Sequence, residues 1–156
     1  MNASRRTLLF GAAAVLLTPA ARATLGEDLA SVQADALRLG AARRANANST
    51  PQVQVQVLKL PGGGHIRQFA TPEGRVFAVA WNTPAKPRLD TLLGTHFAAY
   101  AEGGRQAQAQ RAGVSHTARI AQGDLVVEST AHLNAHVGRA WLKSLWPAGL
   151  GIDALR

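Results

Sequence analysis

Residues 75–81 read Arg-Val-Phe-Ala-Val-Ala-Trp, and this stretch decides the fold of the chain. Its apolar residues are consecutive rather than alternating, which is typical of a strand covered on both faces. The preceding residues 71–74, Thr-Pro-Glu-Gly, favour a tight turn, because proline suits its second position and glycine its fourth. We therefore predict a central strand that follows directly on a neighbouring strand.

Two further strands are predicted before this turn. Residues 65–70 form the nearer strand, and a Pro-Gly-Gly-Gly loop at 61–64 joins it to a farther strand. That farther strand, residues 52–60, alternates polar and β-branched residues as far as Val57, where the apolar positions shift to even numbers. A bulge, or a strand covered on both faces, would explain the shift. The short connections favour an antiparallel meander.

One amphipathic helix is predicted before the meander in the sequence and one after it. Within residues 89–100 the apolar side chains recur at helical spacing, and Gly103-Gly104 is expected to end that helix. A second helix, at about 27–39, starts with acidic residues and ends before a glycine. Residues 41–51 lack bulky apolar groups and are predicted to be a linker. Packing the first helix on the meander would bury its apolar stripe and form the core.

The C-terminal part is predicted to add a loop and a hairpin. Residues 105–122 are rich in Gln, Ala, Gly and Arg and are expected to form a mobile loop with a short strand near 114–120. Residues 124–129 and 132–137 favour a late β-hairpin that turns at Thr130-Ala131. The tryptophans of the tail, residues 140–147, are expected to cover the core.

These patterns together predict a single domain over residues 24–156. Its fold class is α+β: an antiparallel β-meander sheet packed by an amphipathic helix, with an additional N-terminal helix and the late hairpin.

The first 23 residues have the order of a bacterial signal peptide. Arg5 and Arg6 make the start positive, an uncharged apolar stretch follows, and Ala21 and Ala23 frame a small-residue cleavage motif before Thr24. The apolar stretch is shorter than the roughly 20 residues that cross a bilayer as a helix. We therefore expect cleavage before Thr24, no stable membrane span afterwards, and a periplasmic or secreted product. An uncleaved membrane anchor is the alternative.

The export route depends on the arginine pair. Arg5 and Arg6, followed by Thr-Leu-Leu, resemble the twin-arginine motif, which directs export of folded proteins. An ordinary secretory signal also begins with basic residues, and we favour that general secretory route.

Composition restricts the classes of function. Cleavage would remove three arginines and lower the formal net charge from +8 to +5. The remaining basic residues are scattered and the aromatic residues lie within apolar runs, so we expect no nucleic-acid partner. The chain has no cysteine, which excludes thiol catalysis and cysteine-ligated metals. We expect no bound cofactor.

His132 and His136 are the candidate metal ligands. Residues four apart lie on one face of a strand or a helix and could share a metal ion. Asp124 or Glu128 could complete the set, as could the other histidines His65, His96 and His116. Leu133 stands where a metalloprotease motif would require glutamate.

Other polar pairs are candidates for catalysis. Ser115 beside His116, and Ser129 near His132, supply a nucleophile and a base without forming a known motif. Asp124 and Glu128, four apart, could form an acid/base pair or simply border an apolar strand. We assign no catalytic residue.

Several segments resemble a family of small exported bacterial proteins, domain-of-unknown-function 2844. The resemblance runs along nearly the whole mature chain, in residues 23–26, 74–81, 92–94 with Phe97 and Tyr100, 124–129, 138–140 and 147–149. These are mostly apolar strand and helix positions, so the resemblance implies a shared fold. It implies no activity and no catalytic residue.

Two functions follow as hypotheses. The first is an exported, non-catalytic module that binds an envelope protein or another envelope component. The alternative is a small periplasmic enzyme or metal-binding protein that uses His132 and His136 with an acidic residue.

Overall fold

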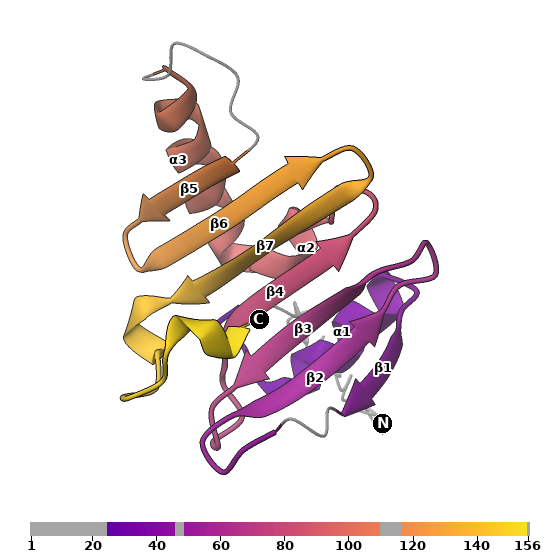
Figure 1. Cartoon of the computed structure of the whole chain (residues 1–156). Helices are drawn as coiled ribbons and strands as arrows, with labels where there is room; N and C mark the ends of the chain where they lie inside the picture. Colours follow the sequence, from indigo (N-terminus) through magenta and orange to yellow (C-terminus); the bar gives the residue numbers. More distant parts are fainter. Residues whose placement is uncertain (1–24, 46–48, 110–116, 156) are drawn as a thin grey trace, which may run out of the picture.

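The computed structural model describes residues 25–45, 49–109 and 117–155, which form a seven-stranded antiparallel sheet with helices on one face (Figure 1). The strand order is β1-β2-β3-β4-β7-β6-β5, so two meanders meet where β4 pairs with β7. The strands are β1 (Ala42–Ala45), β2 (Gln54–Lys59), β3 (His65–Ala70), β4 (Val76–Thr83), β5 (Thr117–Gln122), β6 (Leu125–His132) and β7 (Ala135–Leu142). The predicted α+β class and meander are confirmed.

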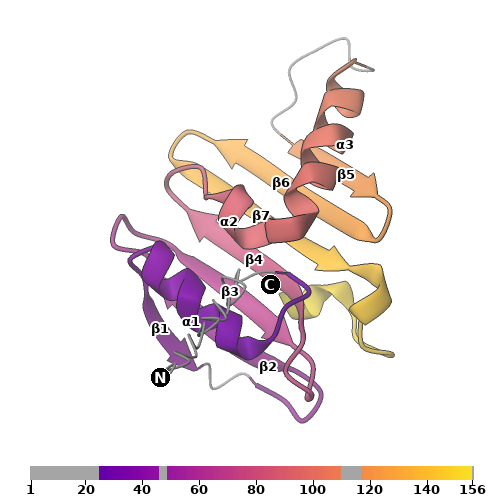
Figure 2. The same ribbon diagram turned by 180° about the vertical axis from the view of Figure 1, so that it is seen from behind.

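In the described part of the chain, three α-helices lie on one face of the sheet, as Figure 2 shows from behind. They are α1 (Leu29–Arg38), α2 (Leu89–Leu93) and α3 (Phe97–Ala109). The predicted N-terminal helix is confirmed as α1, and the side chain of Asp28 caps it by accepting a hydrogen bond from the Ser31 backbone N–H at 3.1 Å. Apolar side chains of α1 and α2, among them Val32 and Leu92, pack with Leu58, Ile66 and other strand residues to form the larger core. No helix of the described residues is long and apolar enough to cross a membrane.

The strand β2 is covered on both faces, which explains the shift of its apolar positions. Its pairing with β3 continues without a break from Gln54 to Lys59. Val55 points into a second core on the far face, whereas Leu58 belongs to the core beneath the helices. The bulge lies instead between β3 and β4, where Phe77 is an extra residue between the partners of Phe69 and Ala70.

The linker predicted at residues 41–51 contains the edge strand β1. Its Arg43 and Arg44 are exposed, and charged side chains are common on edge strands because they discourage pairing with other chains. The stretch lacks bulky apolar residues because it lies at the rim of the sheet, not because it is unstructured.

The predicted helix over 89–100 is two helices. Gly94 adopts φ 46 and ends α2, and a short 3-10 turn leads into α3. The prediction that Gly103-Gly104 ends the helix is wrong, since α3 continues to Ala109. Gly103 lets α3 lie against β5: a Cβ there would stand 2.5 Å from Cγ2 of Ile120.

The mobile loop predicted at 105–122 is also largely regular structure. The end of α3 and the whole of β5 occupy it, while residues 110–116 lie outside the described residues. The late hairpin is confirmed as β6–β7, but it turns at Leu133-Asn134 rather than at Thr130-Ala131. Asn134 has φ 58, a left-handed conformation that asparagine tolerates better than most residues.

The C-terminal segment covers part of the face opposite the helices (Figure 1). Trp146 packs edge-on against Phe77 at 5.5 Å between ring centroids, and it also contacts Trp141. The short 3-10 helix η3 (Ile152–Leu155) places Leu155 in this second core with 2 % of its surface exposed. Both tail tryptophans therefore cover a core, as predicted.

One polar pair is buried between α1 and β3. The Gln68 amide nitrogen donates a hydrogen bond of 2.8 Å to Oδ2 of Asp35, and both residues are almost fully buried. Among the described residues, Oδ1 of Asp35 and Oε1 of Gln68 have no hydrogen-bond partner. Burial raises the pKa of Asp35 from 3.8 to about 7, although the Gln68 bond and the charge of Arg38 oppose the rise.

Candidate binding groove

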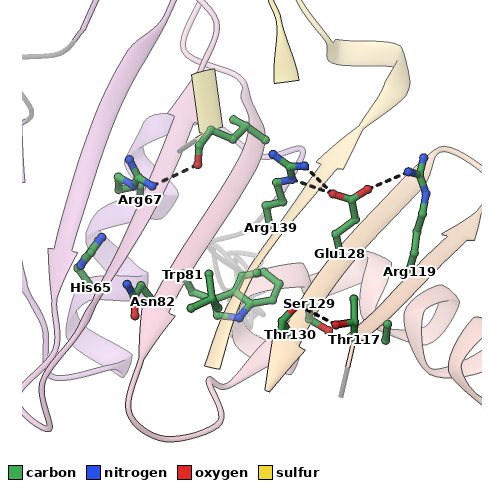
Figure 3. A pocket seen from close by; sticks show the side chains of 14 residues that line it. His65, Arg67, Trp81, Asn82, Thr117, Arg119, Glu128, Ser129, Thr130 and Arg139 are labelled. Carbon is green, nitrogen blue, oxygen red and sulfur yellow. Dashed lines mark hydrogen bonds and ion pairs between the residues drawn. The ribbon is translucent and has the colours of Figure 1, made fainter. Parts of the chain in front are cut away.

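A hollow of about 760 Å³ lies on the face opposite the helices, beside the C-terminal segment (Figure 3). Its floor runs across β3, β4, β7, β6 and β5, and Leu155 of η3 contributes to one side. We call this hollow the sheet groove. It occupies the part of the face that Trp146 and η3 leave uncovered.

Strand register aligns charged side chains into a row across the sheet. Arg67 stands opposite Ala80, Ala80 opposite Arg139, Arg139 opposite Glu128, and Glu128 opposite Arg119. We call these five residues the arginine row. Neighbouring strands lie about 4.8 Å apart, so the row extends about 19 Å from Arg67 to Arg119.

Ion pairs and backbone contacts fix the arginine row. Glu128 accepts hydrogen bonds from Arg119 on Oε1 at 2.9 Å and from Arg139 Nε on Oε2 at 2.9 Å (Figure 3). Arg139 also donates to the carbonyl of Ile152, and Arg67 donates to that of Leu155, both at 3.2 Å. Arg67 and Arg139 therefore bind the C-terminal segment to the sheet, while the charged groups of all three arginines border the groove.

A second row runs beside the first and is displaced from it by two residues in every strand. His65 pairs with Asn82, Asn82 with Val137, Val137 with Thr130, and Thr130 with Thr117. We call these five residues the polar row. The Thr117 and Thr130 hydroxyls lie 3.3 Å apart. Two residues of strand span about 7 Å, so the two rows form parallel lines of charged and neutral hydrogen-bonding groups.

The groove is positively charged. Among the described residues, three arginines border it against one carboxylate, that of Glu128. Burial lowers the pKa of His65, and the positive charges of Arg67 and Lys59 lower it further. His65 is consequently a neutral imidazole near pH 7, with one nitrogen that donates and one that accepts.

The face shared by His132 and His136 does not exist in the fold. Because the turn at Leu133-Asn134 lies between them, His132 stands opposite Ala135 while His136 stands opposite Ala131. Adjacent positions of a strand point to opposite faces, so the two imidazoles leave the sheet on opposite sides. The register therefore does not give the two histidines the common strand face that the metal prediction assumed. In the described part of the chain, no three His, Asp or Glu side chains gather as a metal site.

Of the other candidates, Asp124 and His96 lie near each other: hydrogen bonding from Ser144 lowers the pKa of Asp124 most, and the charge of His96 also contributes. Asp124 precedes β6 and accepts hydrogen bonds from the Ser144 backbone N–H at 2.8 Å and hydroxyl at 2.6 Å. Glu128 is held by arginines instead, so the two acids have separate partners. Ser129 borders the groove, as does His65. Outside the described residues lie Ser115 and His116, together with the predicted export and cleavage residues Arg5, Arg6, Ala21, Ala23 and Thr24.

Sequence reasoning missed the arginines of the groove. Arg67, Arg119 and Arg139 come from three strands that are far apart in sequence. The alternation of each strand predicts which face its arginine takes, but only the pairing register aligns the three. Predicting their alignment requires the strand order and the register of β4 against β7.

Comparison with known proteins identifies a family but no activity. The sequence profile described as "Protein of unknown function (DUF2844)" matches residues 21–155. No curated protein and no solved structure matches the chain. Since the match extends over most of the 156 residues, the chain belongs to the DUF2844 family of proteins of unknown function.

Proposed function

We propose that the protein acts outside the cytoplasm as a small, non-catalytic module that binds an envelope component in the sheet groove. The observation that carries this proposal is the pair of parallel rows, one charged and one polar, on an uncovered part of the sheet. Their backbone positions are set by strand pairing on both sides, except in the edge strand β5, which pairs with β6 alone, so little conformational freedom is lost when a partner binds.

The hydrogen bonds that Glu128 accepts favour a role in binding over a role in acid–base chemistry. A general base must accept a proton from its substrate, whereas both oxygens of Glu128 already accept hydrogen bonds from guanidinium groups. Its carboxylate orients Arg119 and Arg139. This is the arrangement expected of a recognition surface, in which charged side chains are held ready for a partner.

Binding can be tested by sedimentation with isolated bacterial cell envelopes. Arg119→Gln removes an exposed groove arginine that pairs with one carboxylate. Arg88→Gln is the matched control, because Arg88 is equally exposed, at 68 % against 67 %, and pairs with Asp90 at the start of α2. We expect the wild type and Arg88→Gln to sediment and Arg119→Gln to be depleted from the pellet. Failure of the wild type to sediment, or equal sedimentation of all three proteins, would contradict the proposal.

Export rests on the sequence of residues 1–23. The full chain with a C-terminal tag should yield a periplasmic or secreted product whose mass corresponds to a start at Thr24. Replacing Arg5 and Arg6 by lysines should leave export nearly intact on the general secretory route, whereas loss of export would identify the twin-arginine route. A full-length product confined to the cytoplasm would refute export.

A further inference from the structure

We propose that the ligand of the sheet groove is an acidic oligosaccharide, with carboxylates on the arginine row and hydroxyls on the polar row. This inference rests on the proposed function, because it names the class of ligand that the same groove accepts. Three properties of the groove lead to it: its charge, the chemistry of its floor and the spacing of its rows.

The charge selects an anion. Arg119 uses Nη1 for its bond to Glu128, and 67 % of its side chain is exposed, so much of the guanidinium faces solvent. Arginine presents a planar fork of donors that matches a carboxylate. Glu128 cancels one positive charge but also holds the guanidinium groups of Arg119 and Arg139 on either side of it. The excess positive charge attracts an anion, while the fixed geometry favours one with spaced acidic groups.

The floor of the groove disfavours a peptide that binds through its backbone. The strands beneath the groove pair on both sides with their neighbours, apart from the edge strand β5, so their N–H and C=O groups are already used within the sheet. An extended peptide binds a sheet by adding to an edge, where these groups are exposed. A ligand lying across this floor must be recognised through side chains.

Those side chains suit hydroxyl groups. The polar row presents two threonine hydroxyls, the Asn82 amide and the neutral imidazole of His65, each of which can both donate and accept. Val137 is its one apolar member. A sugar hydroxyl has the same double capacity, whereas an acidic peptide offers few hydroxyls. The polar row lies about 7 Å from the arginine row, which places the two kinds of contact on opposite sides of a narrow chain.

The length of the rows favours an oligomer over a single sugar. The arginine row extends about 19 Å across the strands, and its cationic members stand at both ends and near the middle. A single carboxylate would engage one end only. Successive acidic sugars along the row would engage Arg119 and Arg67 together, and the two contacts would reinforce each other.

The test uses the mature protein and tetragalacturonate at low salt, with calorimetry as the readout. Two probes separate charge from hydroxyls: the methyl-esterified tetrasaccharide keeps the hydroxyls without the charge, and tetraglutamate keeps the charge without sugar hydroxyls. We expect measurable binding of tetragalacturonate and at least tenfold weaker binding of either control probe. Because one charge-assisted hydrogen bond is worth on the order of tenfold in affinity, Arg119→Gln should weaken tetragalacturonate binding about tenfold and Arg88→Gln less than twofold.

A second variant tests the polar row without changing charge. Thr130→Val removes a hydroxyl with almost no change of shape at a half-buried strand position. It should weaken tetragalacturonate binding about threefold and leave any residual tetraglutamate binding unchanged. Chemical shifts should place the bound sugar at His65 and Thr130, and far-ultraviolet circular dichroism should show that each variant is folded.

Several results would overturn the inference. Equal binding of tetraglutamate and tetragalacturonate would show that charge alone is recognised, and equal losses in Arg119→Gln and Arg88→Gln would show non-specific attraction. Absence of tetragalacturonate binding at millimolar concentration would exclude this ligand class. Each of these results leaves the proposed function intact if the envelope pellet still retains the wild type in preference to Arg119→Gln, so the two failures are distinguishable.

Discussion

Replacing Asp35 by asparagine should remove the loss of stability that the wild type undergoes as the pH rises from about 4 to about 7. The pKa of Asp35 rises from 3.8 to about 7 on burial, so between about pH 4 and pH 7 the folded protein holds a proton that the unfolded chain has released. Stability from this group is therefore fully present below pH 4 and is lost as the pH rises towards 7. At about 1.4 kcal/mol for each unit of pKa, the loss is up to about 4 kcal/mol.

The two atoms without partners show how the proton is held. A protonated Oδ1 of Asp35 can donate to Oε1 of Gln68 while Oδ2 accepts from the Gln68 amide, which gives a cyclic acid–amide pair. Asparagine at position 35 can make the same pair through its own amide, without a titrating group. Asp35→Asn should therefore gain about 2–3 kcal/mol on the wild type between pH 5 and pH 8, because about 1.5 kcal/mol of the wild type's loss already occurs below pH 5.

Urea unfolding followed by tryptophan fluorescence at pH 5 and pH 8 measures both effects. Asp28→Asn is the matched control, because Asp28 is an exposed carboxylate that caps the same helix and asparagine caps equally well. It should follow the wild type at both pH values. If Asp35→Asn differed from the wild type by the same amount at pH 5 and pH 8, Asp35 would not hold a proton in the fold and the reasoning would be refuted.

Four further substitutions test packing and local hydrogen bonds. Gly103→Ala should destabilise the protein by about 1–3 kcal/mol, because its Cβ would overlap β5, whereas Gly104→Ala, with 3.7 Å of clearance, should stabilise it by about 0.5–1 kcal/mol. Equal effects in urea unfolding would contradict this packing. Leu155→Ala should cost about 2–5 kcal/mol and shift tryptophan emission to the red as the C-terminal segment loosens; unchanged emission would argue against that docking. Asp124→Ala should lower stability by about 1 kcal/mol through loss of its bonds to Ser144, and no loss would show that they contribute nothing.

Local patterns in the sequence were sufficient for most of the regular elements. The apolar run at 75–81 predicted a central strand and became β4, and the spacing of Val32 and Ala36 predicted a helix that became α1. These predictions succeed because side-chain periodicity reports which face of an element is buried. They fail where burial is decided by distant residues: Gly103 was expected to end a helix, but contact with Ile120 gives a glycine there a packing role.

The sheet groove depended on tertiary structure in the same way. From sequence, His132 and His136 were the most suggestive pair, and the position of one turn separates them onto opposite faces. No sequence motif connects Arg67, Arg119 and Arg139. Strand register alone aligns them. A hairpin turn that moves by a few residues changes which side chains meet, and local composition constrains that position only weakly.

The sequence by itself determined the fold class, the central strand β4, the absence of cysteine chemistry and the resemblance to the DUF2844 family, because each depends on residue type or short-range spacing. Tertiary structure alone decided the joining of the two meanders through β4 and β7, the burial of Asp35 against Gln68 and the alignment of the arginine row. Those features join residues that are distant in the sequence. Asp35 and Gln68 lie 33 positions apart, and the arginines of the row come from three separate strands. They arise from strand pairing and helix docking, whose register is set by the packing of the whole core.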